Sequence, residues 1–202
     1  MDITRRGLTA LGLAPLLTGW LVGCDRAPGA AAFKAIDITG AEYALDFDLP
    51  DADGKRRRLA DFKGKVTVVF FGYTQCPDVC PTTMAELAEV KKSLGVDGER
   101  VQGIFITVDP ERDTAELLKA YVTNFSPDFV ALRGTVDETN AVAKQFKVFF
   151  AKVPGKTEGS YTIDHTAGSY VYDARGKLRL FMRYGSGAEA LAHDLKLLLS
   201  QP

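Results

Sequence analysis

A continuous apolar run, Val66–Phe71, leads into the segment Cys76-Pro77-Asp78-Val79-Cys80-Pro81, and residues at helical spacing follow it. An uninterrupted apolar run of this length is typical of a strand that is buried on both faces. The pattern therefore predicts a strand, a cysteine-containing turn and a helix, in that order. At such a junction the unpaired N–H groups of the first helical turn stabilise a thiolate.

The patterns on either side extend this unit into an α/β fold. Residues 101–108 predict a second buried strand, and a right-handed crossover through a helix at 81–94 makes it parallel to 66–71. The remaining expected elements are a strand at 42–49, a hairpin turn at 51–54, a helix opened by a capping-box pattern at 113–116, a strand at 129–132, a helix at 136–146, a hairpin-like excursion at 148–161, an antiparallel pair at 168–173 and 177–183, and a helix at 188–199. This order predicts a thioredoxin-like fold, with a central mixed sheet flanked by helices, an N-terminal β-hairpin and a hairpin-like insertion.

The first residues predict a targeting signal. Arg5-Arg6 precedes an apolar stretch that is shorter than the about 20 residues needed to span a bilayer. The stretch ends at Leu21-Val22-Gly23-Cys24, which resembles the cleavage site of a bacterial lipoprotein, and the arginine pair resembles a twin-arginine leader. We expect a signal peptide at 1–23, a lipidated Cys24 with a tether at 24–41, and one folded domain at 42–202. An uncleaved signal anchor is the alternative, and both place the domain outside the cytoplasm.

The charge balance argues against a nucleic-acid partner. The chain has 25 basic and 26 acidic residues, a formal net charge of −1. Its basic cluster Arg56–Arg58 is short, and we expect it on a solvated strand face.

Once Cys24 is assigned to the leader, the two remaining cysteines lie in one turn. A structural disulfide between them would stabilise the fold by only about 2 kcal/mol, because the loop it closes is so short. A redox-active pair and a pair of metal ligands are the stronger interpretations. A lone histidine such as His165 is more often structural, but its position makes it a candidate third ligand. In thioredoxin-fold oxidoreductases a cis-proline in the loop before the strand that corresponds to 168–173 faces the cysteines. This chain has no proline between Pro154 and Pro202, and His165 occupies that loop. His193 is expected on the solvated surface of the last helix.

Three motifs in this chain resemble the Sco/SenC copper-chaperone family. Phe70–Thr83 is similar to the family signature, Val108–Thr114 to its second motif, and Asp164-His165-Thr166 to the motif that carries its metal-binding histidine. Asp53-Gly54-Lys55 and Leu59–Lys65 also match the family pattern, so the resemblance spans nearly the whole mature chain.

The resemblance implies that one copper ion, Cu(I) or Cu(II), is bound by Cys76, Cys80 and His165. Thiolate suits Cu(I) and imidazole suits both oxidation states, although Zn(II) would accept the same ligands. Asp78 is expected either to stabilise the helix N-terminus or to tune the site and contact a partner. The implied role is delivery of copper to the CuA centre of cytochrome c oxidase.

The expected partners are the oxidase subunit that carries CuA and a periplasmic copper carrier or thiol reductant. The protein is expected to be a monomer at the periplasmic face of the inner membrane. The alternative function is a thiol–disulfide reductase, in which Cys76 or Cys80 attacks a disulfide of the oxidase copper site. A redox or copper sensor is a third interpretation.

The sequence also suggests how the turn is built. On a helical first turn Cys76 and Cys80 would share a face, with Pro77 at the first helical position. Pro81 would distort the turn and keep both sulfurs accessible. Four further expectations are an ion pair between Asp109 and Arg112, capping by Asp113, a docking rim formed by Tyr73 and the 148–161 excursion, and core packing of Met84 and Met182.

Overall fold

Strand β4 (Val66–Gly72) lies at the centre of the main sheet, in a computed structural model that describes residues 32–201. Every residue of β4 is buried. Strand β5 (Val101–Thr107) runs parallel to it, with Val66 opposite Val101, and β9 (Gly168–Tyr172) runs antiparallel on its other side. The predicted parallel pair is confirmed.

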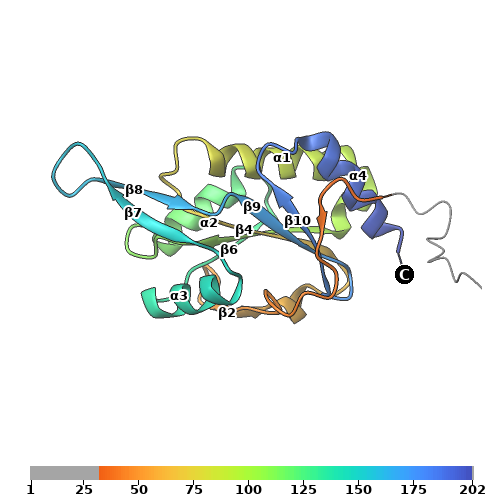
Figure 1. Cartoon of the computed structure of the whole chain (residues 1–202), viewed down its shortest axis with the longest axis horizontal. Coiled ribbons are helices and arrows are strands. Elements are labelled where there is room, and N and C mark those ends of the chain that lie inside the picture. The colour runs from red at the N-terminus through yellow and green to blue at the C-terminus, as the bar shows by residue number, and fades with distance from the viewer. Residues whose placement is uncertain (1–31, 202) are drawn as a thin grey trace, which may run out of the picture. The chain divides into compact units, whose positions relative to one another are not determined.

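The main sheet has six strands in the order β1-β10-β9-β4-β5-β6. Its remaining strands are β1 (Ile36–Asp37), β10 (Leu178–Arg183) and β6 (Val130–Leu132). Helices α1 (Val79–Ser93) and α4 (Ala188–Leu199) pack side by side over one face, and α3 (Val136–Gln145) lies on the opposite side (Figure 1). Helix α2 (Ala115–Thr123) packs against β6. This is the mixed α/β arrangement that the sequence predicts.

Two short hairpins stand outside the main sheet, and both were expected. Strands β2 (Asp48–Pro50) and β3 (Arg56–Arg58) form the N-terminal hairpin. Strands β7 (Phe150–Pro154) and β8 (Tyr161–His165) form the second one, which extends beyond the main sheet in Figure 1. The 148–161 excursion is therefore the first strand and the loop of an ordered hairpin, and its second strand ends at His165.

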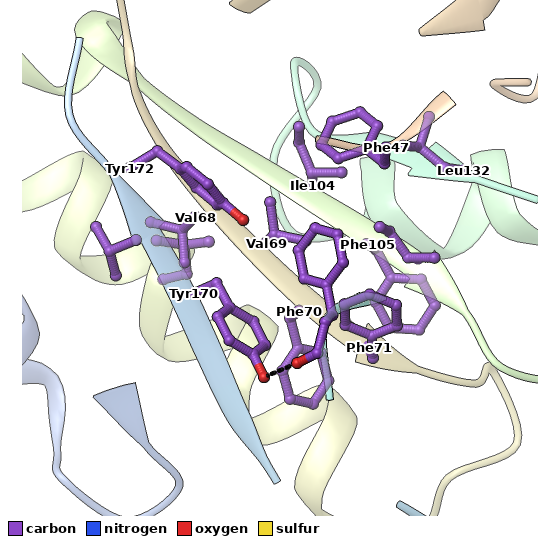
Figure 2. Close-up of a cluster of buried hydrophobic side chains, with 14 of the residues drawn as sticks. Phe47, Val68, Val69, Phe70, Phe71, Ile104, Phe105, Leu132, Tyr170 and Tyr172 are labelled. Atoms are coloured by element: carbon purple, nitrogen blue, oxygen red, sulfur yellow. Dashed lines mark hydrogen bonds between the residues drawn. The ribbon is translucent and has the colours of Figure 1, made fainter. Parts of the chain in front are cut away.

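Aromatic side chains fill the core beside β4. Figure 2 shows Phe70 and Phe71 of β4 close to Phe105 of β5, with Tyr170 and Tyr172 of β9 alongside. The two tyrosine hydroxyls are satisfied, because they donate to the backbone carbonyls of Phe146 and Ala44. Burial of these large aromatic surfaces stabilises the domain around the carboxyl end of β4.

The strand predicted at 42–49 is wrong over most of its length, because only Asp48–Pro50 is strand. Ala44 has a positive φ of 52° and is fully buried, while Leu45 beside it is 57% exposed. The left-handed residue interrupts the alternation of a strand. Its N–H donates to the carbonyl of Gln145 at 3.0 Å, so a distant contact sets this conformation.

Three further elements were not predicted: β1, which pairs with β10, and the 3₁₀ helices η1 (Leu59–Phe62) and η2 (Gly95–Arg100). The predicted signal peptide at 1–23 and the predicted lipidation of Cys24 concern residues outside those that the structure describes. Within residues 32–201, no helix is both long enough and apolar enough to cross a bilayer.

Candidate metal centre

The cysteine segment connects the end of β4 to the start of α1. Helix α1 begins at Val79 with Asp78 as its N-cap, so Cys80 lies in the first helical turn and Cys76 precedes the helix. The backbone N–H of Cys80 donates to Sγ of Cys76 at 3.4 Å. The two sulfurs are thus brought together by a turn that folds back on the helix N-terminus. Pro77 lies outside the helix, and its predicted place at the first helical position is wrong.

Cys80 is fully buried, which contradicts the prediction that both sulfurs are accessible. Pro81 is the third helical residue, where a backbone N–H has no partner within the helix in any case. The next residue, Thr82, donates normally to the carbonyl of Asp78 at 3.1 Å, so the proline does not distort the turn. Cys76 is half-buried, and both cysteines are free thiols.

His165 is the last residue of β8 and faces the thiols. Its Nε2 lies 3.4 Å from Sγ of Cys80, and its Nδ1 lies 3.1 Å from the carbonyl oxygen of Thr166. Because a carbonyl oxygen only accepts, Nδ1 carries the hydrogen and Nε2 presents its lone pair to Cys80. Burial lowers the pKa of His165 below its ordinary value of 6.5, which favours the neutral imidazole that a metal binds.

Cys76, Cys80 and His165 form a group that could hold one metal ion. One ligand atom from each lies within 4.8 Å of the others. Two sulfurs that share one ion at bonds of about 2.3 Å in a trigonal plane stand about 4 Å apart, so only a small closure is needed to bind. Burial raises the pKa of the Cys80 thiol, and a bound cation would have to displace that proton.

An open cleft of about 290 Å³ reaches the site from solvent. Its lining includes Cys76, Pro77, Asp78 and His165, and Cys80 lies behind it. A ligand from another protein would therefore meet Cys76 and His165 first.

Asp78 lies at the mouth of this cleft. It is exposed and accepts a hydrogen bond from the Thr82 hydroxyl at 3.3 Å. Its carboxylate makes no capping hydrogen bond to a backbone N–H. The position suits a contact with a partner, and the same carboxylate at the N-cap also interacts favourably with the helix dipole.

Several residues near the site lie elsewhere than the sequence suggested. Tyr73 lines the cleft but is buried, and it accepts a hydrogen bond from the backbone N–H of Ile163 at 3.2 Å, so it lies inside the cleft and not on an exposed rim. Asp113 does not cap α2, because Thr114 does, and it accepts hydrogen bonds from Thr74 and Thr107 instead.

Three other expectations concern residues outside the ligand group. The predicted ion pair between Asp109 and Arg112 is confirmed. His193 is half-buried, and its Nδ1 lies 2.8 Å from a carboxylate oxygen of Asp194, so a fully solvated position is wrong. Met84 and Met182 are buried, as predicted.

Sequence reasoning missed Gly72, on which the sulfur of Cys80 packs. A Cβ atom built on Gly72 would lie 2.8 Å from that sulfur. The available signal was a glycine at the end of an otherwise apolar strand, which often marks a close approach of another group to the backbone.

Known proteins share both the sequence and the fold of this chain. The family model described as SCO1/SenC matches residues 37–200. A SCO2-like protein of Rickettsia felis is 38% identical over 152 residues, which cover 75% of this chain and 74% of the relative. The mitochondrial SCO2 homolog of Bos taurus is 35% identical over 191 residues, which cover 93% of this chain and 71% of the relative.

Two solved structures extend the comparison. ScoI of Bradyrhizobium japonicum with copper bound is 43% identical, with a TM-score of 0.67 over 75% of this chain and 96% of that one. Apo Sco1 of Thermus thermophilus is 36% identical, with a TM-score of 0.72 over 82% of this chain and 96% of that one. On the sequence match and the shared fold, this chain belongs to the SCO1/SenC family.

Proposed function

We propose that this protein is a copper metallochaperone that carries one copper ion on Cys76, Cys80 and His165 and delivers it to the CuA centre of cytochrome c oxidase. The observation that carries the proposal is the convergence of two thiols and one unprotonated imidazole nitrogen within 4.8 Å. Family membership supports copper as the cargo, because ScoI of Bradyrhizobium japonicum and yeast Sco1 were both solved with copper bound.

The chemistry of the donor set suits this cargo. Thiolates select Cu(I), and a neutral imidazole binds either oxidation state of copper. The two sulfurs differ in access, since Cys80 is buried and Cys76 is half-buried at the cleft. We infer that a partner thiolate first replaces Cys76, so that copper passes to the partner by stepwise ligand exchange and is never released to solvent.

The domain would act at the periplasmic face of the inner membrane, held there by acyl chains on Cys24. The leader pattern supports this location, and a SCO1/SenC family lipoprotein from Bacillus anthracis is 27% identical, with a TM-score of 0.66 over 83% of this chain and 99% of that one. Two or more acyl chains on Cys24 would be sufficient for stable membrane attachment.

A thiol–disulfide reductase that acts on the cysteines of the oxidase copper site is the second candidate. It is favoured by the free thiol of Cys76, which is open to the cleft and lies beside a helix N-terminus. In this reaction Cys76 would attack the partner disulfide, and Cys80 would then displace the reduced partner thiol and leave a Cys76–Cys80 disulfide. The order follows from burial, because Cys80 cannot reach a partner first.

Titration of the reduced protein with Cu(I) tests the chaperone function. The wild type should bind one equivalent of copper. His165→Ala removes a proposed direct ligand, so it should weaken copper binding by more than the about 10–100-fold that follows the loss of a residue hydrogen-bonded to a ligand. His193→Ala is the matched control, since it removes the only other histidine and should bind like the wild type. The same variants are then assayed for reduction of a disulfide-containing CuA domain. Copper binding by His165→Ala as tight as that of the wild type, with unchanged reductase activity, would overturn the chaperone function.

A further inference from the structure

His165 is carried by a hairpin that has no backbone pairing with the main sheet. Strands β7 and β8 pair only with each other among the described residues. An isolated two-stranded hairpin is only marginally stable in water. The chain continues from His165 into β9, and the N–H of Tyr184 donates to the carbonyl of Ala167 at 3.2 Å, which anchors the base of the hairpin. The orientation of β8 beyond this base depends on side-chain contacts that tie it to the domain.

One guanidinium group contacts both segments that carry the residues of the metal centre, the cysteine segment and strand β8. Nη1 of Arg112 donates to the backbone carbonyl of Tyr161, the first residue of β8, at 2.9 Å, and the guanidinium carbon lies 3.6 Å from the centre of the Tyr161 ring. On the cysteine side, Nη1 also donates to Oε1 of Gln75 at 3.2 Å, and the Tyr73 ring lies 5.8 Å from the same carbon. Arg112 thus bridges the segment that holds the cysteines and the strand that holds His165.

The buried carboxylate of Asp109 fixes the orientation of this bridge. One of its oxygens pairs with Nε of Arg112, and the other accepts a hydrogen bond from the Tyr161 hydroxyl at 2.9 Å. A second cation, Nζ of Lys152, lies 4.7 Å from the Tyr161 ring and pairs with Glu111. The Tyr161 side chain is therefore held by its hydroxyl group and by cations over its ring.

The strand transmits this constraint to the metal centre. Residues 161, 163 and 165 share one face of β8, because side chains alternate along a strand. The middle one, Ile163, is buried, and its N–H donates to the Tyr73 hydroxyl at 3.2 Å. Contacts that fix Tyr161 and Ile163 therefore also fix the position of His165, which is the next residue on the same face of β8.

We propose that Arg112 is a positioning residue, which holds β8 through Tyr161 so that Nε2 of His165 stays against Sγ of Cys80. It binds no copper itself, and the inference rests on the proposed function of the site. The planar guanidinium of arginine is required, because it stacks on the Tyr161 ring while its Nε bonds to Asp109 and its Nη1 donates to Tyr161 and Gln75. A lysine keeps the charge and loses this geometry.

Arg112→Lys tests the proposal, and Arg133→Lys is its matched control. Nε and Nη2 of Arg133 donate to the carbonyl of Pro110, at 3.2 and 2.8 Å, so Arg133 supports the same loop without contacting β8. Arg112→Lys should weaken Cu(I) binding about tenfold, the effect of losing a cation–π contact and a charged hydrogen bond. Arg133→Lys should leave the affinity unchanged.

A double-mutant cycle separates positioning from a general loss of structure. In a His165→Ala background, Arg112→Lys should weaken copper binding no further, because the ligand that Arg112 positions is gone. An equal loss in both backgrounds would mean that Arg112 acts on the cysteines or on the fold, and would overturn the proposal. An Arg112→Lys protein with wild-type affinity would overturn it as well, since charge alone would then suffice.

The ¹⁵N signals of the His165 ring provide a readout without copper. The reduced wild type should show one tautomer, protonated at Nδ1. Arg112→Lys should shift the ¹⁵N signals towards the values of a free imidazole, which exchanges between its two neutral tautomers. Unchanged ring signals would overturn the proposal even if the wild type bound no copper, in which case the proposed function would fail separately. If Arg112→Lys does not fold, Tyr161→Leu removes the same stack and should give the same ring signals and affinity loss; wild-type behaviour of Tyr161→Leu would again overturn the proposal.

Discussion

The sulfur of Cys80 rests on the bare backbone of Gly72. A Cβ atom on Gly72 would lie 2.8 Å from that sulfur and 2.9 Å from the rings of Phe70 and Phe105. The end of β4 therefore provides the floor of the metal centre, and glycine is required there for space. Gly72 is not among the positive-φ glycines, so backbone conformation is not the reason.

Gly72→Ala should destabilise the protein by about 1–3 kcal/mol through overpacking and should also weaken copper binding by displacing Cys80. Gly103→Ala is the matched control in the neighbouring strand, because its Cβ would meet Phe129 and Leu87 at 2.7–3.0 Å, and Cys80 is not among its nearest neighbours. Urea unfolding and Cu(I) titration of both variants check this. Gly103→Ala should lose stability alone, and equal copper affinity in both variants would contradict the role of Gly72.

Alkylation of the metal-free protein should distinguish the two cysteines. Cys76 is half-buried at the cleft, whereas Cys80 is fully buried and its burial raises the pKa of its thiol. Since the thiolate is the nucleophile, iodoacetamide should modify Cys76 on the order of tenfold faster or more. Peptide mass mapping over time measures the two rates. In denaturant the rates should converge, and faster modification of native Cys80 would contradict the structure.

The stability of the reduced, metal-free protein should fall with acidification through the titration of His165. Burial lowers the pKa of this histidine below 6.5, so the unfolded chain binds its proton more readily than the folded one. The contribution of His165 is fully present above pH 6.5 and is lost as the pH falls towards the folded-state pKa. Chemical unfolding at a series of pH values should show a smaller loss for His165→Gln than for the wild type, and identical pH profiles would contradict the assignment.

Tyr73→Phe should lower stability by about 1–3 kcal/mol, because it leaves the buried N–H of Ile163 without a partner. It should also weaken copper binding, since this bond holds β8 beside the cysteine segment. Tyr172→Phe is the control, because it removes a buried hydroxyl that donates to the carbonyl of Ala44 at 2.7 Å, away from the metal centre. Thermal unfolding should shift in both variants, and Cu(I) affinity should change in Tyr73→Phe alone.

Most elements of the fold could be predicted from local pattern. The apolar runs that form β4 and β5 and the amphipathic pattern of α4 appear within a few residues of the expected bounds. Residues 42–47 also alternate, yet they form no strand, because Ala44 bonds to Gln145 and adopts a left-handed conformation. That bond joins residues about a hundred positions apart, and no local pattern encodes it.

The sequence by itself determined the chemistry of the site, because the motifs around Cys76, Cys80 and His165 supply the donor atoms and their order. The tertiary structure alone decided how these donors differ. Packing of α1 on β4 buries Cys80 over Gly72 and leaves Cys76 at the cleft, so one thiol is held protonated while the other can react. It also assigned Arg112 to the hairpin, because stacking on Tyr161 joins segments that are distant in sequence. Ligand identity is a local property of the chain, whereas burial, proton affinity and orientation depend on which surfaces meet when the chain folds.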